Sequence, residues 1–442
     1  MTTKWNQLFA TALVIAFAPL ARGQIVELLY SFPNRTNGIS PEAKLVQARN
    51  GLFYGSTSIE GISNKGTIFQ ISADKTFTTL VYFAGTNGSV PMAPMLEGRD
   101  GNLYGTTAAG GIFDSGTIFK MTTNGVLTTL FSFDGTNGGL IFGGLFEAAD
   151  GEFYGTTTVG GEFSLGSVYK FSTNGVFTTL ISFDGTNGRH PRGELVEVSE
   201  GVFYGTASSG GLNNNGTVFS IDADGILTTL HLFNGTNGAN PRGNLTIGKD
   251  GYLYGTTRAG GLTNYGTVFK ITTNGELTSI VSFNGTNGRI PNAGLIRAGA
   301  GNIYGTTQRG GSGGINDHGI VFKINLIGTF STLVAFGNLG NPLAGVIEAS
   351  DGNLYGTATS GGYIYGGVFR VLFPHLTSRV SDNELVLSWP INAVGFTLQS
   401  AANLNSSTNW IDFTNVPAVV GAQFMVTNSV SGSAQFYRLK KP

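Results

Sequence analysis

Residues 145–188 read LFEAADGEFYGTTTVGGEFSLGSVYKFSTNGVFTTLISFDGTNG. Four runs in this stretch are rich in the aromatic, β-branched and leucine residues that strands prefer. The runs are residues 145–148, 153–157, 167–171 and 177–183. Asp150-Gly151 and Asn174-Gly175 are tight-turn signals, and a longer glycine-rich loop joins the middle two runs. The stretch therefore predicts one four-stranded antiparallel sheet.

The same pattern recurs along most of the chain at a spacing of about fifty residues. A string G-x-[LFI]-Y-G-[ST] begins at Gly51, Gly101, Gly151, Gly201, Gly251, Gly301 and Gly352. A string close to GTVFK begins at Gly66, Gly116, Gly166, Gly216, Gly266, Gly319 and Gly366. A string TTLxSFxGTNG ends at Gly88, Gly138, Gly188, Gly238 and Gly288, with weaker copies at 28–38 and 332–341. Seven four-stranded units predict a β-propeller, in which neighbouring sheets cover each other's faces.

The phase of the repeats predicts how this ring closes. The chain starts with a run of the fourth type at residues 25–32, and its repeats end with a run of the third type at residues 368–371. We therefore expect the first strand to complete the last sheet and to remove an exposed edge. After Pro374 the repeat stops and short alternating apolar runs predict a small β-sandwich. The predicted fold is all-β: a seven-bladed β-propeller at 24–373 closed by the N-terminal strand, then a sandwich at 374–442.

The repeated strings GNLYGTT, GTVFK and TTLxSFxGTNG resemble the GloVer tandem repeat, the Gloeobacter and Verrucomicrobia type, over residues 25–371. The order of the strand-like runs is also similar to that of kelch and NHL propellers. The resemblance implies an exported bacterial repeat protein with a variable C-terminal sorting or anchoring segment, and it implies no known enzymatic activity. A packing domain or spacer remains the alternative for the C-terminal segment.

Composition excludes several classes of protein. Glycine accounts for 69 residues, aromatic residues make up 11% and charged residues 12%, which is unlike a disordered chain. The formal net charge of −1 supplies no general attraction to nucleic acid or to an anionic membrane. The chain has no cysteine, which excludes disulfides, a thiol nucleophile and a lipid-attachment cysteine. We expect no cofactor.

The motifs of common catalytic and metal sites are missing from the sequence. The starts of the innermost predicted strands contribute Glu194 as the single carboxylate near the ring axis, whereas glycoside chemistry needs two. The histidines, His190, His231, His318 and His375, lack metal-ligand spacing. The DGTNG strings favour a structural turn over a calcium loop, because Ala84, Asn234 and Asn284 replace the aspartate in other copies. No catalytic or metal-binding residue is predicted.

One sector of the predicted ring is basic. Its candidate ligand-binding residues are Arg189, His190, Arg192, Arg242, Arg258, Tyr265, Arg289, Arg309 and His318. Arginine forks match carboxylate and sulfate groups, and Tyr265 offers a ring for stacking on a sugar. The sequence therefore predicts a monomeric, non-catalytic extracellular binding or structural protein whose partner is an acidic polysaccharide or a cell-surface component. The alternatives are a carbohydrate-active hydrolase or lyase, a purely structural surface protein, and solvated charges without a ligand.

Residues 1–23 have the pattern of a signal peptide. Lys4 supplies the positive start, residues 8–18 the apolar stretch, and Ala21 and Gly23 the small residues before a cleavage site. An uncleaved anchor is the alternative. We expect export with cleavage before Gln24, a secreted or cell-surface protein, and no membrane span afterwards. Intact-mass measurement of exported protein should give residues 24–442, and a mass that includes residues 1–23 would contradict the cleavage.

Overall fold

The computed structural model describes residues 25–299, 301–311, 317–325, 327–337, 340–359, 365–373, 376–381, 384–390, 396–402, 409–414, 416–421, 423–429 and 435–440. The signal-peptide prediction and His375 lie outside these residues. The chain divides into two compact units, Val26–Val371 and a second one made of Met1–Ile25 with Leu372–Pro442. No helix among the described residues has the length and apolar character needed to cross a membrane.

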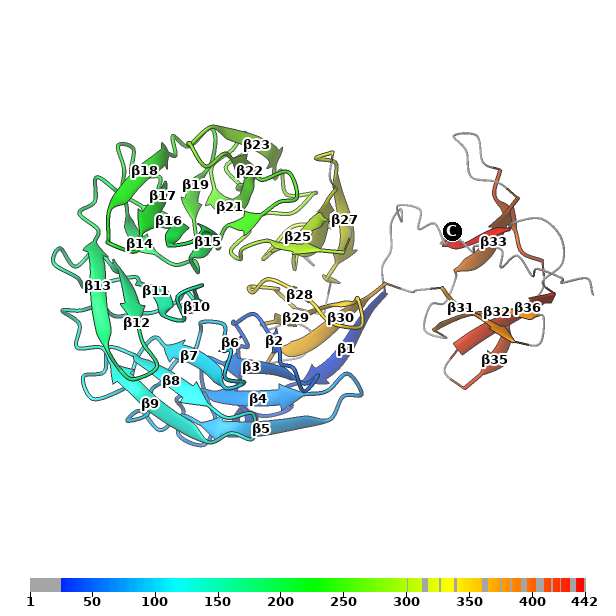
Figure 1. Ribbon diagram of the computed structural model, residues 1–442, viewed down its shortest axis with the longest axis horizontal. Coiled ribbons are helices and arrows are strands. Elements are labelled where there is room, and N and C mark those ends of the chain that lie inside the picture. The colour runs from blue at the N-terminus through cyan, green and yellow to red at the C-terminus, as the bar shows by residue number, and fades with distance from the viewer. Residues whose placement is uncertain are drawn as a thin grey trace, which may run out of the picture. The chain divides into compact units, whose positions relative to one another are not determined.

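Sheets dominate the first unit and lie around a common centre, as Figure 1 shows. The described residues of this unit form seven sheets, five with four strands and two with five. The first three sheets consist of β2 (Val46–Gln47), β3 (Phe53–Thr57), β4 (Thr67–Ile71) and β5 (Phe77–Tyr82); β6 (Leu96–Glu97), β7 (Leu103–Thr107), β8 (Thr117–Met121) and β9 (Leu127–Ser132); and β10 (Phe146–Glu147), β11 (Phe153–Thr157), β12 (Ser167–Phe171) and β13 (Phe177–Ser182). A single turn of 3-10 helix, Arg35–Asn37, follows the first strand.

The fourth and fifth sheets each carry an additional short strand. Their strands are β14 (Arg189–Pro191), β15 (Val196–Ser199), β16 (Val202–Ser209), β17 (Thr217–Asp222) and β18 (Leu227–Leu232); and β19 (Ala239–Pro241), β20 (Thr246–Ile247), β21 (Leu253–Ala259), β22 (Thr267–Ile271) and β23 (Leu277–Ser282). The extra strands β14 and β19 pair with the far ends of β16 and β21. The sixth and seventh sheets consist of β24 (Ile296–Ala298), β25 (Asn302–Thr307), β26 (Ile320–Ile324) and β27 (Phe330–Ala335); and β28 (Ile347–Glu348), β29 (Leu354–Ala358), β30 (Gly367–Leu372) and β1 (Ile25–Ser31). The predicted all-β, propeller-like arrangement of four-stranded sheets is confirmed.

The repeated aromatic residues pack between neighbouring sheets. Tyr154 of β11 stacks on Phe203 of β16 with the ring centroids 4.1 Å apart, and Tyr104 lies 4.4 Å from Phe153 in the same way. The glycine after each repeated tyrosine makes room for the third strand. A Cβ atom on Gly205 would lie 2.6 Å from Cζ of Phe219, which is too close for any side chain. The invariant Tyr-Gly pair thus serves the packing of both faces of a sheet.

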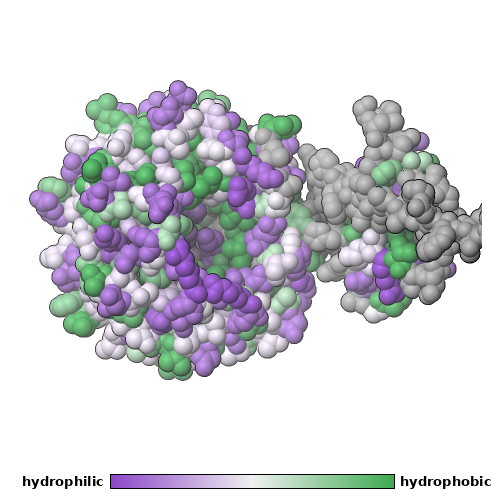
Figure 2. Space-filling model, viewed as in Figure 1, coloured by the Kyte–Doolittle hydropathy of each residue, from purple (hydrophilic) through white to green (hydrophobic). Residues whose placement is uncertain are grey.

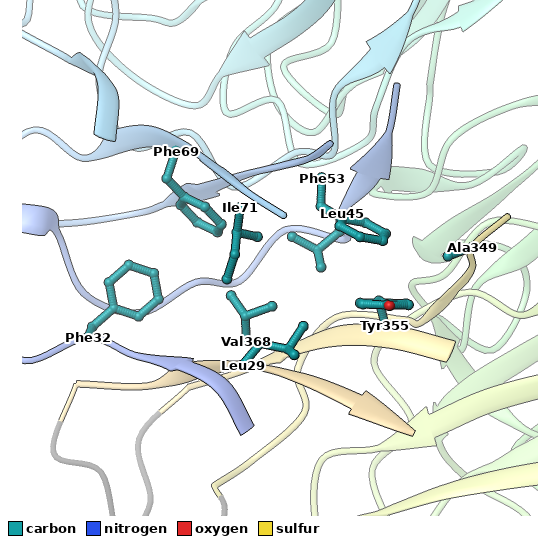
Figure 3. Packing of buried hydrophobic residues seen from close by; sticks show 9 residues of the cluster. All are labelled: Leu29, Phe32, Leu45, Phe53, Phe69, Ile71, Ala349, Tyr355 and Val368. Carbon is teal, nitrogen blue, oxygen red and sulfur yellow. The ribbon is translucent and has the colours of Figure 1, made fainter. Parts of the chain in front are cut away.

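The first strand joins the last sheet, as the phase of the repeats predicts. β1 pairs with β30, and the backbone N–H of Phe32 donates to the carbonyl of Gly366 at 3.0 Å. Figure 3 shows Leu29 and Phe32 of this segment packed with Phe69 and Val368, which come from opposite ends of the repeat array. Closing the ring therefore buries apolar side chains of the first and last sheets together.

The second unit contains two sheets within its described residues. One has the order β31 (Thr377–Ser381), β32 (Glu384–Pro390), β36 (Gln423–Ser429) and β35 (Ala418–Val420), and the other β34 (Ile411–Asp412), β33 (Thr397–Ala401) and β37 (Phe436–Lys440). Trp389 from the first sheet and Tyr437 from the second are each 1% exposed in one apolar cluster. The alternating apolar residues of this segment thus form a core of its own.

Removal of residues 25–32 should destabilise the first unit. The deletion exposes an edge of β30 and uncovers the cluster around Val368, and each buried Leu or Phe side chain contributes about 1.5–3 kcal/mol. We expect aggregation on size-exclusion chromatography, or a fall in melting temperature of several degrees for the milder variant Leu29→Asp. The exposed-site variant Arg35→Ala is the control. A monomeric deletion protein with an unchanged melting temperature would contradict ring closure by this strand.

Candidate functional site

Seven lead-in segments carry the chain into the innermost strands. They are residues 41–45, 91–95, 141–145, 191–195, 241–245, 291–295 and 342–346. Six begin with proline, and the residue before the proline turns the chain, as at His190 with a φ of 54°. The N–H of His190 donates to the carbonyl of Leu165, in the loop between β11 and β12, at 2.8 Å. We call the end of the ring formed by the lead-in segments and the loops between second and third strands the loop face.

Threonine hydroxyls fix these segments against the preceding sheet. Thr156 donates to the carbonyl of Gly193 at 3.3 Å, and Thr206 donates to that of Gly243 at 3.2 Å. The middle residue of the segment must be small, because a Cβ atom on Gly193 would lie 2.8 Å from the backbone of Gly243. The residues on either side of this small residue line a cavity at the centre of the ring.

The cavity has a volume of about 260 Å³ and two layers of lining residues. The outer layer takes the second residue of each lead-in segment: Glu42, Met92, Phe142, Arg192, Arg242, Asn292 and Leu343. The inner layer takes the fourth: Lys44, Pro94, Gly144, Glu194, Asn244, Gly294 and Gly345. Figure 2 shows the ring hollowed at its centre, with hydrophilic residues around the hollow. Two variable positions of the repeat thus surround the axis.

An ion pair spans the inner layer. The Nζ atom of Lys44, in the first unit of the repeat, lies 3.4 Å from Oε2 of Glu194 in the fourth. These two residues are 150 positions apart in the chain, and the contact crosses the axis of the ring. The charged residues of the inner layer are therefore paired with each other across the axis.

Arg192 and Arg242 of the outer layer, and Arg258 of β21 near them, lack a carboxylate partner. Burial, and then the charges of Arg192 and Arg258, lower the pKa of Arg242 to about 10, and burial and Arg258 lower the pKa of Arg192. None of the three forms a salt bridge within the described residues. Asn240 accepts a hydrogen bond from Nε of Arg242 at 2.7 Å, and the guanidinium of Arg192 lies 4.5 Å from the ring centroid of Phe142. The cavity therefore presents uncompensated positive charge at its outer layer.

Glu42 lies in the same layer, in the first unit of the repeat. Burial raises the pKa of its carboxyl, while a hydrogen bond from the hydroxyl of Ser58, 3.4 Å away, opposes the shift. The prediction that Glu194 is the single carboxylate near the axis is therefore wrong, because Glu42 lines the same cavity. The signal was present in the sequence: Glu42 follows its proline at the same offset as Arg192 and Arg242.

The other predicted site residues lie outside the cavity lining, and most of them contact nearby residues. Arg289 forms an ion pair with Asp317 and lies 5.8 Å from the ring centroid of Tyr265. The N–H of Arg289 donates to the carbonyl of Arg309 at 2.7 Å, and the side chain of Arg309 is exposed. Nδ1 of His318 lies 3.1 Å from Oδ1 of Asn341.

Arg189 and His190 flank the arginine group. Burial and the charges of Arg189 and Arg192 lower the pKa of His190, which favours its neutral form at pH 7. The Nε atoms of Arg189 and Arg258 are buried without a hydrogen-bond partner among the described residues. Of the nine predicted residues, the structure thus brings Arg192, Arg242 and Arg258 together, with Arg189 and His190 beside them.

The DGTNG strings form compact turns. The carboxylate of Asp134 accepts hydrogen bonds from the N–H groups of Thr136 and Asn137, each at 2.9 Å, which lowers its pKa. Asn234 makes the equivalent bond to Asn237 at 3.0 Å. Among the described residues, no group of three His, Asp or Glu side chains is placed to hold a metal ion.

Comparison with known proteins identifies the repeat. A family model of the Gloeobacter/Verrucomicrobia repeat matches residues 2–201 and 190–370. The chain belongs to this repeat family. The resemblance of the repeated strings is thereby confirmed. A comparison with curated protein sequences gave no match.

Several solved structures are similar to this chain. Virginiamycin B lyase from Staphylococcus aureus is similar with a TM-score of 0.54 and 14% identity, over 79% of this chain and 100% of the lyase. A Bacteroides uniformis protein assigned as a 6-phosphogluconolactonase gives 0.45 and 18%, over 65% and 83%. A Xanthomonas campestris gluconolactonase gives 0.41 and 11%, over 78% and 88%. At such identities the first likeness supports the propeller-like fold of the repeat.

Replacement of Glu42 by Gln should stabilise the protein at neutral pH. The pKa of the Glu42 carboxyl is raised above the usual 4.5 in the folded protein, so the folded protein binds the carboxyl proton more tightly than the unfolded chain does. Protonated Glu42 therefore favours folding below pH 4.5. This contribution to stability is lost as the pH rises through the folded-state pKa. Glu42→Gln should therefore raise the melting temperature by a degree or more at pH 7, for about 1 kcal/mol, and by less near pH 4. Glu162→Gln, at an exposed site, is the control. A gain that does not depend on pH would contradict the shift.

Proposed function

We propose that this protein is an extracellular, non-catalytic binding protein for acidic polysaccharide, which it holds by arginines at the centre of its loop face. The supporting observation is that Arg192, Arg242 and Arg258 lie together without a carboxylate partner among the described residues. Besides burial, the charge of Arg258 lowers the pKa of Arg192, and the charges of Arg192 and Arg258 lower that of Arg242. An anion placed between them would relieve this repulsion. Arginine forks bind carboxylate and sulfate oxygens in paired hydrogen bonds.

The proposed location rests on the sequence. Residues 1–23 carry the signal-peptide pattern, and the family comparison assigns the repeats to a type named from two bacterial groups. The low charge content and net charge of −1 suit a protein without general affinity for nucleic acid, and we propose that it is a monomer. Arg189, Arg309 and the cluster around Arg289 would add weaker contacts along a polymer on the same face.

The proposed architecture is a seven-bladed β-propeller at residues 24–373 followed by a small β-sandwich at 374–442. The sheets of residues 26–371 and the order β1-β30-β29-β28 support a closed ring of seven blades. The core that Trp389 and Tyr437 share between two sheets supports a sandwich. We propose that the sandwich sorts or attaches the protein at the cell surface, with a spacer as the alternative role.

An acidic-glycan array tests the binding function. The mature protein should bind uronic-acid or sulfated polymers at low salt, and the signal should fall at moderate salt because exposed charges are screened. The double variant Arg192→Ala/Arg242→Ala should lose at least about tenfold in affinity, because a hydrogen bond to a charged group contributes about 1.5–3 kcal/mol. Arg309→Ala, which is exposed, should lose little.

The same array separates the other outcomes. Equal signals from wild type and the double variant, or no signal for acidic glycans, would refute the function. A chain ending at residue 373 should bind as well as the full chain, and an unfolded fragment would contradict the domain boundary.

A carbohydrate-active enzyme is the second candidate, because Glu42 and Glu194 both line the cavity. Glycoside hydrolysis requires an acid and a second carboxylate close to the scissile bond. New reducing ends or unsaturated sugars after incubation with a bound polymer would favour the enzyme, and loss of turnover in Glu42→Gln without loss of binding would locate it.

A further inference from the structure

An ion pair lies across the axial cavity below its outer layer. Each lead-in segment runs from the loop face toward the innermost strand, so its second residue lies nearer the loop face than its fourth. Lys44 and Glu194 are both fourth residues, and their ion pair crosses the axis below the layer of Arg192 and Glu42. The volume of about 260 Å³ lies just below the 300–1,000 Å³ of pockets for drug-sized ligands, which gives room for one sugar residue.

The outer layer is divided into three kinds of surface. Arg192 and Arg242, in the fourth and fifth units, supply hydrogen-bond donors with positive charge. Met92 and Phe142, in the second and third, supply an apolar wall. Glu42, in the first unit, is an acceptor on the far side of the ring from the arginines, because the first of seven units lies opposite the fourth and fifth.

A free acceptor completes this lining. The side-chain nitrogen of Asn292 donates to Gln308 at 2.7 Å, which leaves Oδ1 of Asn292 directed elsewhere. That oxygen is buried and lacks a partner among the described residues. A buried acceptor without a partner costs about 1–3 kcal/mol, and a ligand hydroxyl reaches this oxygen only after the Asn292 side chain turns toward the cavity.

We propose that this cavity binds the terminal uronic-acid residue of an acidic polysaccharide, so that the protein recognises chain ends; this rests on the proposed function. The sugar carboxylate meets Arg192 and Arg242, and a C–H face of the ring packs on Phe142. Hydroxyls donate to Glu42 and, once the Asn292 side chain turns toward the cavity, to its Oδ1 atom. A plain inorganic anion would satisfy the arginines but leave both acceptors empty. A neutral sugar would leave the arginine charges uncompensated. The Lys44–Glu194 ion pair prevents a chain from passing through.

Calorimetry with a length series of defined oligosaccharides tests this. The probes are galacturonic acid, its dimer and trimer, long polygalacturonate, and the corresponding mannuronate series, all with the full mature protein at one salt concentration. One protein should bind per chain at every length, and monomer and trimer of the preferred series should agree in affinity within about threefold. Galactose, which differs from galacturonic acid in lacking the carboxylate, should not bind.

Substitutions of the lining residues test whether the ligand binds in the cavity. Arg192→Ala/Arg242→Ala should lower monomer affinity at least tenfold, and Glu42→Ala about two- to tenfold, for one hydrogen bond of roughly 0.5–1.5 kcal/mol. Arg309→Ala should leave monomer affinity unchanged. Circular dichroism confirms that each variant is folded.

The outcomes separate the two proposals. Affinity that rises steeply with length, with several proteins on each polymer and no monomer binding, would overturn end recognition while acidic-polysaccharide binding stands. Monomer binding that Arg309→Ala weakens as much as the cavity variants would also overturn it. No binding to any member of either series, together with an empty acidic-glycan array, would remove both proposals.

Discussion

Five of the seven sheets among the described residues are held to the next by a threonine hydroxyl that donates to a carbonyl at the start of the following unit. Thr156, Thr206 and Thr256 make this bond to Gly193, Gly243 and Ala293 at 2.9–3.3 Å. The last unit makes it to the first, from Thr357 to Ala43 at 3.1 Å. Because the hydroxyl sits on a second strand with both faces buried, the bond is shielded from water and fixes the lead-in segment in one position.

That constraint explains why the variable residues can face the axis. The small residue whose carbonyl is held, such as Gly193, keeps adjacent segments in close backbone contact, so the residues on either side of it project into the cavity. None of these residues belongs to the apolar clusters found between the sheets among the described residues. A repeat with a nearly constant frame can therefore carry Glu42 in one unit, Phe142 in another and Arg242 in a third.

Periodicity explains which features were predictable from the sequence. The strand runs of residues 145–188 agree with β10–β13 to within one or two residues, because turn signals and strand preferences coincide in every copy. The pairing of β1 with β30 followed from phase alone. Arg192 and Arg242 were found by their charge. Glu42 was not predicted as a cavity residue, because its segment leads from loop to strand and the sequence does not show which side chains reach the axis. The ion pair of Arg289 with Asp317 depends on the longer loop of the sixth unit, which departs from the repeat.

The charged residues at the axis affect the stability of the free protein and its affinity for ligands in different ways. The Lys44–Glu194 pair brings opposite charges together, whereas burial and neighbouring positive charges lower the pKa values of Arg192 and Arg242, which lack a carboxylate partner among the described residues. Such an arrangement costs stability in the free protein, since a buried cation without a partner is more costly than a well-packed apolar side chain. An anion that enters the outer layer recovers this free energy on binding. Arg192 and Arg242 thus lower the stability of the free protein, and the same two residues would favour an acidic ligand over a neutral sugar of the same shape.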